Sequence, residues 1–218
     1  MTHLHIPDGV LPVLVWAPGL AVALLLLLLS ARAARGATRQ HVAYQGALGA
    51  LVLAVMAVEV PLGPLEYHLT LMGPVGVLLG PAGAFQVAFV ASAILALVGH
   101  GGLTVVGLNA VVLGAGSALA RPVYVLLVER LGPPAAMACG TALAQAVSGV
   151  LWLAVVAVGM HASTAGAHRL GLFAAFAFPL WLVGIVIESL VAFGIAGFIA
   201  RVRPDLLPGR TGAAGEPS

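Results

Sequence analysis

The chain has 218 residues, of which 61% are hydrophobic and only 7% charged, and its mean hydropathy is +1.13. Soluble domains carry about 25% charged residues to cover their surfaces, so this composition excludes a water-soluble protein and a disordered one. The single cysteine, Cys139, excludes a disulfide scaffold, and the scattered net charge of +2 excludes nucleic acid as a partner. The composition therefore predicts an all-α, polytopic integral membrane protein.

Seven apolar stretches are expected to form membrane helices, since a helix needs about 20 apolar residues to cross a bilayer. In chain order they are residues 13–31, 41–60, 71–80, 83–98, 104–128, 134–159 and 172–200. The first is interpreted as a retained helix rather than a signal peptide, because arginines follow it instead of preceding it. The third is short and either continues into the fourth or is broken from it; Pro81 and its flanking glycines favour a break.

The arginines orient these helices, because cytoplasmic loops carry an excess of positive charge. With seven helices and the N-terminus outside, the arginines on the inner side are Arg32, Arg35, Arg39, Arg130, Arg201, Arg203 and Arg210. Six helices would move four of these outside and remove the bias. We therefore expect an outside N-terminus, a single seven-helix domain over residues 1–203 and a short, flexible cytoplasmic tail over residues 204–218. The expected location is the plasma membrane, where lipid surrounds the helices.

The same topology places six of the seven histidines on or near the outer side, namely His3, His5, His68, His100, His161 and His168. The N-terminal pair forms a candidate chelator, because a free α-amine, a deprotonated amide and an imidazole can bind one metal through fused rings. Such a flat nitrogen donor set suits Ni(II) or Cu(II). Two incidental surface histidines are the alternative interpretation.

The chelating amine belongs to Met1, or to Thr2 if Met1 is removed. With Met1 retained, the four nitrogens of the plane are the terminal amine, the amides of Thr2 and His3, and the His3 imidazole. With Met1 removed, the plane has a vacancy for His5 or for His68, which stands at the head of the short helix. The metal-ligand candidates are therefore these amines together with the three histidines, and a solvated loop histidine is the alternative for His68.

Asp8, His100 and Asn109 are candidates for supporting groups around such a metal site. His100 precedes paired glycines, which allow a tight turn, and Asn109 lies in the following helix, where its amide needs a partner. A turn and an ordinary interhelical hydrogen bond explain these last two residues equally well.

Glu59 and Glu188 are placed within membrane helices, where a carboxylate is costly unless it is paired or neutral. Glu188 is either a structural hydrogen-bond hub or a functional group. The two acids support an alternative function, a secondary ion-coupled transporter or channel, although the absence of paired acids in matching repeats counts against it. Gly46, Ala50 and Ala54 form a stripe of small residues for close packing, within the bundle or against a partner subunit.

The sequence carries no Walker A loop, HExxH, CxxC or Gly-x-Ser-x-Gly motif. Each of these motifs places the groups of a known catalytic or nucleotide-binding site. The chain is therefore expected not to be an enzyme and not to hydrolyse a nucleotide through a Walker A site.

Three motifs resemble one family of membrane transport subunits. They are the run HIPDG at residues 5–9, the block 68–81, and HGGLT at residues 100–104 with Gly107 and Asn109. They are similar to the substrate-binding membrane subunit of cobalt/nickel energy-coupling factor transporters, the CbiM/NikM family. The motifs cover residues 3–128, and the remainder agrees in topology only, since seven helices with an outside N-terminus is the family's architecture.

The resemblance implies a metal-capture permease subunit of an ATP-driven importer, with Co²⁺ or Ni²⁺ as transported substrate and no prosthetic group. It implies a coupling transmembrane subunit and two cytoplasmic ATPase subunits as partners, with a small accessory membrane subunit as a further candidate. In the family the terminal amine, the histidine of the HIPDG run and a loop histidine matching His68 hold the metal. Here three residues, 2–4, precede His5 and displace the amine from it. The choice between His3 and His5 therefore stays open.

Overall fold

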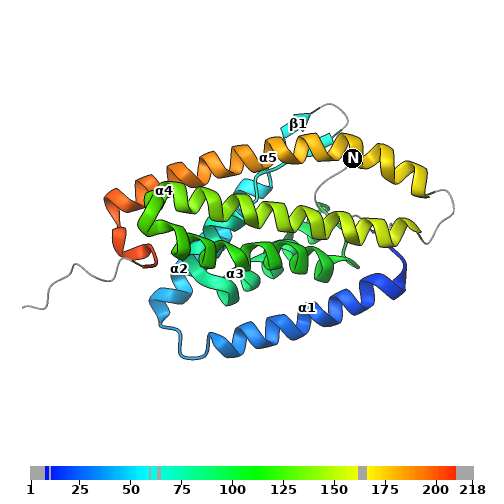
Figure 1. Cartoon of the computed structure of the whole chain (residues 1–218). Helices are drawn as coiled ribbons and strands as arrows, with labels where there is room; N and C mark the ends of the chain where they lie inside the picture. Colours follow the sequence, from blue (N-terminus) through cyan, green and yellow to red (C-terminus); the bar gives the residue numbers. More distant parts are fainter. Residues whose placement is uncertain (1–7, 10, 59, 63–64, 162–165, 210–218) are drawn as a thin grey trace, which may run out of the picture.

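The computed structural model describes residues 8–9, 11–58, 60–62, 65–161 and 166–209 (Figure 1). Five helices form almost all of this part of the chain, and a short antiparallel hairpin separates the second from the third. The elements are α1 (Val13–Ala33), α2 (Arg39–Met56), β1 (Val60–Leu62), β2 (Leu65–Tyr67), α3 (Met72–Leu97), α4 (Val106–His161), α5 (Gly166–Val202) and the 3₁₀ turn η1 (Pro204–Leu206).

The fold is helical as predicted, but a hairpin of two short strands follows α2, which ends before the predicted boundary at residue 60. Val60 pairs with Tyr67, and Leu62 pairs with Leu65. The physical reason lies in Pro61, because the residue before a proline is driven out of the helical region and into an extended conformation. A helix continuing from α2 therefore cannot pass Val60, and the chain turns back as two strands.

The predicted break at Gly80 is confirmed. Gly80 has φ 74° and ψ 179°, a conformation that interrupts α3 and that glycine adopts without a Cβ clash. A Cβ built on Gly80 would also lie 2.9 Å from Nη1 of Arg121 on α4. Pro81, which lacks an amide hydrogen, begins the second part of the helix. The break thus divides α3 into a short first part and a longer second part.

α4 folds back on itself at Gly132, where φ is 75° and ψ is 166° (Figure 1). The predicted helices 104–128 and 134–159 are its two arms, joined by this one residue rather than by a loop. The arms are antiparallel: Ser148 Oγ donates to the carbonyl of Val112 at 3.0 Å, and Gly140 lies against the backbone of Ala120. Small residues at these crossings let the two backbones approach closely.

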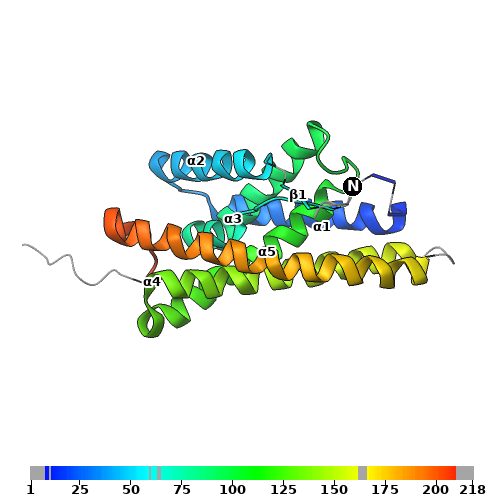
Figure 2. The same cartoon turned by 90° about the horizontal axis from the view of Figure 1, so that it is seen from above.

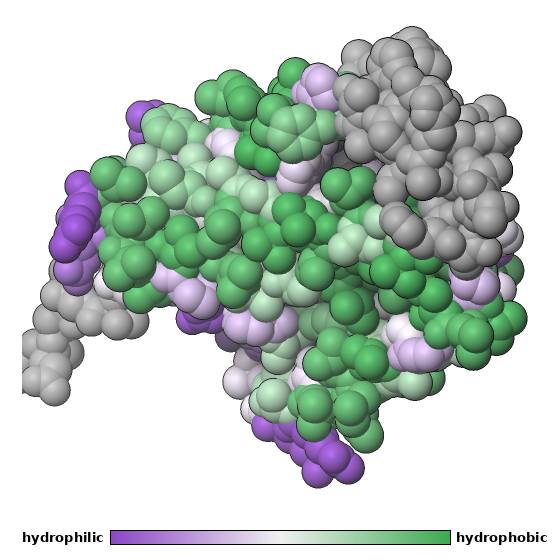
Figure 3. Space-filling view, turned by 45° about the vertical axis from the view of Figure 1, so that its right-hand side comes forward, coloured by the Kyte–Doolittle hydropathy of each residue, from purple (hydrophilic) through white to green (hydrophobic). Residues whose placement is uncertain are grey.

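Apolar side chains cover much of the outer surface, as Figure 3 shows for one face. Exposed examples are Leu14, Leu97, Leu126, Leu190 and Phe198. In the described part of the chain, four helices are long and apolar enough to cross a membrane: Val13–Ala33, Met72–Leu97, Val106–Gly159 and Phe178–Val202. Such a surface is stable in lipid and not in water, so the chain is a multi-pass membrane protein.

The core lies between α3, the two arms of α4 and α5. Tyr124 and Met137, one on each arm of α4, are fully buried in it, beside Ala192 of α5. Leu207, which follows η1, is 3% exposed and belongs to the same cluster. The packed core therefore extends past residue 203, where the sequence predicted the domain to end.

Candidate functional site

Asp8 ties the N-terminal segment to the connection between α3 and α4. Its carboxylate accepts hydrogen bonds from the amides of Leu103 and Thr104, both at 2.9 Å, and from the Thr104 hydroxyl. These hydrogen bonds, that of the Thr104 side chain above all, hold the pKa of Asp8 below its usual value. A Cβ on Gly102 would lie 2.5 Å from Asp8, so only glycine permits this close approach.

His100 and Asn109 lie in the same region as Asp8. His100 stands between Gly99 and Gly101, which both have positive φ, and its amide donates to the carbonyl of Leu95 at 2.8 Å. Asn109 is in the first turn of α4 and is 4% exposed. The three residues predicted as supporting groups thus belong to one end of α4 and the segments around it.

His68 lies between β2 and α3 and is only 3% exposed, in contrast to a solvated loop histidine. The chain after it stays buried, since Thr70 is 1% and Leu71 5% exposed. Leu71 immediately precedes α3 and has φ 54°, the only positive φ of a non-glycine residue in the described part of the chain. Residues 68–71, here called the His68 loop, therefore form part of the bundle rather than of its surface.

Glu188 of α5 holds the His68 loop. Its Oε1 accepts a hydrogen bond from the Thr70 amide at 2.6 Å. Its Oε2 accepts one from the Leu71 amide and one from the Thr70 hydroxyl, both at 3.2 Å. Glu188 is thus a hydrogen-bond hub in this structure. No sequence pattern points to partners 118 residues away, so this contact was missed.

The predicted ligands Met1, Thr2, His3 and His5 lie outside the described residues, as does Glu59 of the alternative function. Within the described ranges, no group of three or more His, Cys, Asp or Glu side chains is arranged to hold a metal ion. The ligand set predicted from the sequence is therefore neither assembled nor contradicted by this structure, and it stays a prediction.

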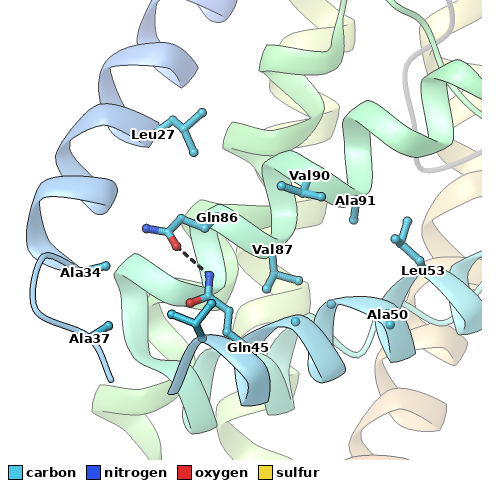
Figure 4. Close-up of a pocket in the computed structure, with 13 residues that line it drawn as sticks. Leu27, Ala34, Ala37, Gln45, Ala50, Leu53, Gln86, Val87, Val90 and Ala91 are labelled. Atoms are coloured by element: carbon cyan, nitrogen blue, oxygen red, sulfur yellow. Dashed lines mark hydrogen bonds between the residues drawn. The ribbon is translucent and has the colours of Figure 1, made fainter. Parts of the chain in front are cut away.

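Gly46, Ala50 and Ala54 are exposed on α2. The first two line a groove of about 570 Å³ between α1, α2 and α3. Figure 4 shows that Gln45 and Gln86 point toward one another at this groove, and Gln45 Nε2 donates to Gln86 Oε1 at 2.7 Å. The stripe thus leaves exposed surface on α2.

These features define the class of the protein: a multi-pass helical membrane protein with a histidine-bearing loop enclosed in its bundle. Residues 5–206 match the family described as CbiM, the cobalt uptake substrate-specific transmembrane region. The chain belongs to this family, which consists of transporter components, and the resemblance recognised in its motifs is confirmed.

Known proteins extend this comparison. The cobalt transport protein CbiM of Geobacter sulfurreducens is 29% identical over 220 residues, which cover 94% of this chain and 61% of that protein. The chain thus spans less than two thirds of the length of this relative. Crystal structures of a transition metal transporter and of a truncated one share the fold, with TM-scores of 0.76 and 0.75 at 18% and 19% identity. The match to the first covers 93% of this chain and 93% of that chain, and the match to the truncated one covers 90% of this chain and 96% of that chain.

Proposed function

We propose that this chain is the metal-capture subunit of an ATP-driven energy-coupling factor importer, with Co²⁺ or Ni²⁺ as its substrate. The family match supports metal uptake. The observation that carries the proposal is the placement of His68, buried on a loop whose backbone is hydrogen-bonded to another helix. A metal-binding imidazole needs such support, because groups behind a ligand set its orientation and basicity.

In this proposal the metal is held by the terminal amine of Met1 or Thr2, by His3 or His5, and by His68. Asp8 supports the arrangement because it ties the segment just after His5 to the beginning of α4. With Met1 removed, the amine of Thr2 and the amide and imidazole of His3 form fused chelate rings, and a fourth nitrogen from His68 completes a plane that suits Ni(II).

The proposed topology has seven crossings, with the N-terminus outside. The breaks at Gly80 and Gly132 support this number, because each divides one long helical element into two parts. The connection between α1 and α2, the fold of α4 and the end of α5 gather at one end of the molecule (Figures 1 and 2). Exposed arginines of this end are Arg32, Arg35, Arg39, Arg130, Arg201 and Arg203. Positive charge favours the cytoplasmic side, so we assign this end to it.

The proposed partners are a coupling transmembrane subunit and two cytoplasmic ATPase subunits, with a small accessory membrane subunit as a further candidate. The chain contains no Walker A loop with which to use ATP itself. The exposed stripe of Gly46, Ala50 and Ala54 is the surface where we expect a partner helix, because small residues let helices approach closely.

The decisive experiment measures Ni²⁺ and Co²⁺ binding by the purified chain with its native, untagged N-terminus. His68→Ala is expected to weaken binding strongly, because one of four ligands is lost, and a tag before Met1 is expected to do the same. His3→Ala and His5→Ala, compared singly, identify the early histidine that binds. The exposed His41, which faces the opposite side in the proposed topology, supplies the control His41→Ala.

Wild-type affinity in both the His68 variant and a His3/His5 double variant would leave the proposal without a site. Uphill metal uptake by the chain alone in liposomes, without ATPase subunits, would contradict the ATP-driven mechanism. That second result would favour a secondary transporter.

A further inference from the structure

We propose that Glu188 is the positioning residue of the metal site: it holds the His68 loop in the conformation in which His68 meets the metal ion. This inference rests on the proposed function and adds a residue on α5 to it. Glu188 contacts the loop through three hydrogen bonds, two of them from the consecutive peptide groups on either side of the Thr70 Cα. Its role is therefore exerted through the loop.

The three hydrogen bonds are made where water does not compete with them. Glu188 is 0%, Thr70 1% and Leu71 5% exposed. In such surroundings a hydrogen bond is electrostatically stronger than in water, and a lost partner is correspondingly costly. The link between α5 and the loop is thus a strong constraint on the loop backbone.

The donors and acceptors of this network fix the chemical nature of the group at position 188. The Thr70 hydroxyl accepts from Gln145 Nε2 at 2.9 Å and from the Met72 amide at 3.3 Å, so its own hydrogen points to Glu188. A hydroxyl has one hydrogen to donate and two lone pairs to accept with, and here all are used. Both oxygens of Glu188 therefore face donors only, an arrangement that a carboxylate satisfies and an amide does not.

The His68 loop needs an external constraint because its conformation is unfavourable by itself. The left-handed conformation of Leu71 is unfavourable for a residue other than glycine, because its Cβ comes too close to the following carbonyl oxygen. The first amides of a helix also lack partners within the helix, and the side chain of Leu71 supplies no cap to α3. The first amide of α3, that of Met72, donates instead to the Thr70 hydroxyl, which in turn donates to Glu188. Glu188 also accepts from the Leu71 amide, so its carboxylate lies near the positive end of the helix dipole.

The consequence for metal binding follows from the short distance along the chain. Thr70 and Leu71, which Glu188 holds, are two and three residues after His68. Without the carboxylate, the left-handed turn at Leu71 is free to relax, and the backbone that aims His68 changes with it. The ligand is then still present but no longer in place.

The test titrates the full-length chain, with its native N-terminus and in detergent, with Ni²⁺ alone, and records both the affinity and the d–d absorption of the bound metal. The variants are Glu188→Gln, His68→Ala and the two combined. The matched control is Gln86→Leu, which removes another interhelical hydrogen bond, between α2 and α3 at 2.7 Å, away from the His68 loop.

We expect Glu188→Gln to weaken Ni²⁺ binding by about 10–100-fold and to shift the absorption band, as is usual when a group behind a metal ligand is altered. Gln86→Leu is expected to bind as the wild type does. Because Glu188 acts through His68, the double variant is expected to bind like His68→Ala alone, so that the two effects do not add.

Wild-type affinity and an unshifted band in a folded Glu188→Gln chain would overturn the inference while leaving the proposed function intact. So would a Glu188→Gln effect that fully adds to that of His68→Ala, because the residue would then act on the fold as a whole. If Glu188→Gln does not fold, Thr70→Val replaces it, with a several-fold loss expected and wild-type affinity contradicting the inference. A wild-type chain that binds neither Ni²⁺ nor Co²⁺ would remove the proposed function itself, and the inference with it.

Discussion

Single carboxylates fix two segments of the backbone in this protein, and the two differ in their exposure to water. Asp8 is exposed and holds the N-terminal segment at Leu103 and Thr104, whereas Glu188 is fully buried and holds the His68 loop. In both cases the carboxylate accepts hydrogen bonds from two consecutive amides. At both positions one side chain holds the backbone of a segment from another part of the chain.

Because the pKa of Asp8 is lowered in the folded protein, its contribution to stability is present above the unfolded value and is lost as the pH falls through the folded value. We therefore expect the amides of Leu103 and Thr104 to stay protected from hydrogen exchange at neutral pH and to lose protection only below the ordinary pKa of aspartate, 3.8. Asp8→Asn is expected to reduce this protection at neutral pH. Equal protection in the variant would show that the carboxylate charge does not hold the segment.

At the scale of the elements, two glycines decide how α3 and α4 run. Gly80 and Gly132 both have a positive φ that other residues rarely adopt, and each interrupts a helix at one residue. Their surroundings differ, since a side chain at Gly80 would meet Arg121, whereas the space around Gly132 is open. At Gly80 both the backbone conformation and the packing against Arg121 therefore require glycine, whereas at Gly132 only the backbone conformation does.

Replacing these glycines by alanine is expected to destabilise the protein to different extents. Gly132→Ala should cost about 1–3 kcal/mol from the backbone conformation alone, because a positive φ with ψ near 180° is essentially confined to glycine. Gly80→Ala should cost more because of the contact with Arg121. Gly194→Ala is the matched control: Gly194 lies in α5 with open space around it, where alanine is expected to be neutral or stabilising. Thermal unfolding in one detergent ranks the three variants, and a Gly80→Ala chain as stable as the control would contradict the argument.

At the scale of the whole molecule, the gathering of exposed arginines at one end gives a direct test of topology. With Cys139 replaced by serine, single cysteines at positions 66 and 130 are expected to react with a membrane-impermeant thiol reagent from opposite sides. Position 130 is expected to face the cytoplasm, because positive charge favours that side, and position 66, in the segment before His68, is expected to face outside. Reaction of both positions from the same side would exclude seven crossings.

The membrane class and the positions of the helices were determined by the sequence itself, because apolar length and proline or glycine breaks are local properties. The break at Gly80 shows this, since a proline flanked by glycines cannot continue a regular helix. The candidates Asp8 and His68 were also found from their motifs. The β-hairpin was not predicted, because its two strands are short and stabilise each other only as a pair.

Only the tertiary structure decided how the helices support the His68 loop. The pairing of Glu188 with Thr70 and Leu71 joins residues 117 and 118 positions apart, and no periodicity or motif encodes such a pair. The burial of Leu207 beyond the expected domain boundary likewise depends on which surfaces meet. The amino-acid composition shows that a segment is apolar. Which donors bind the buried carboxylate within it depends on the segments packed beside it in the folded chain.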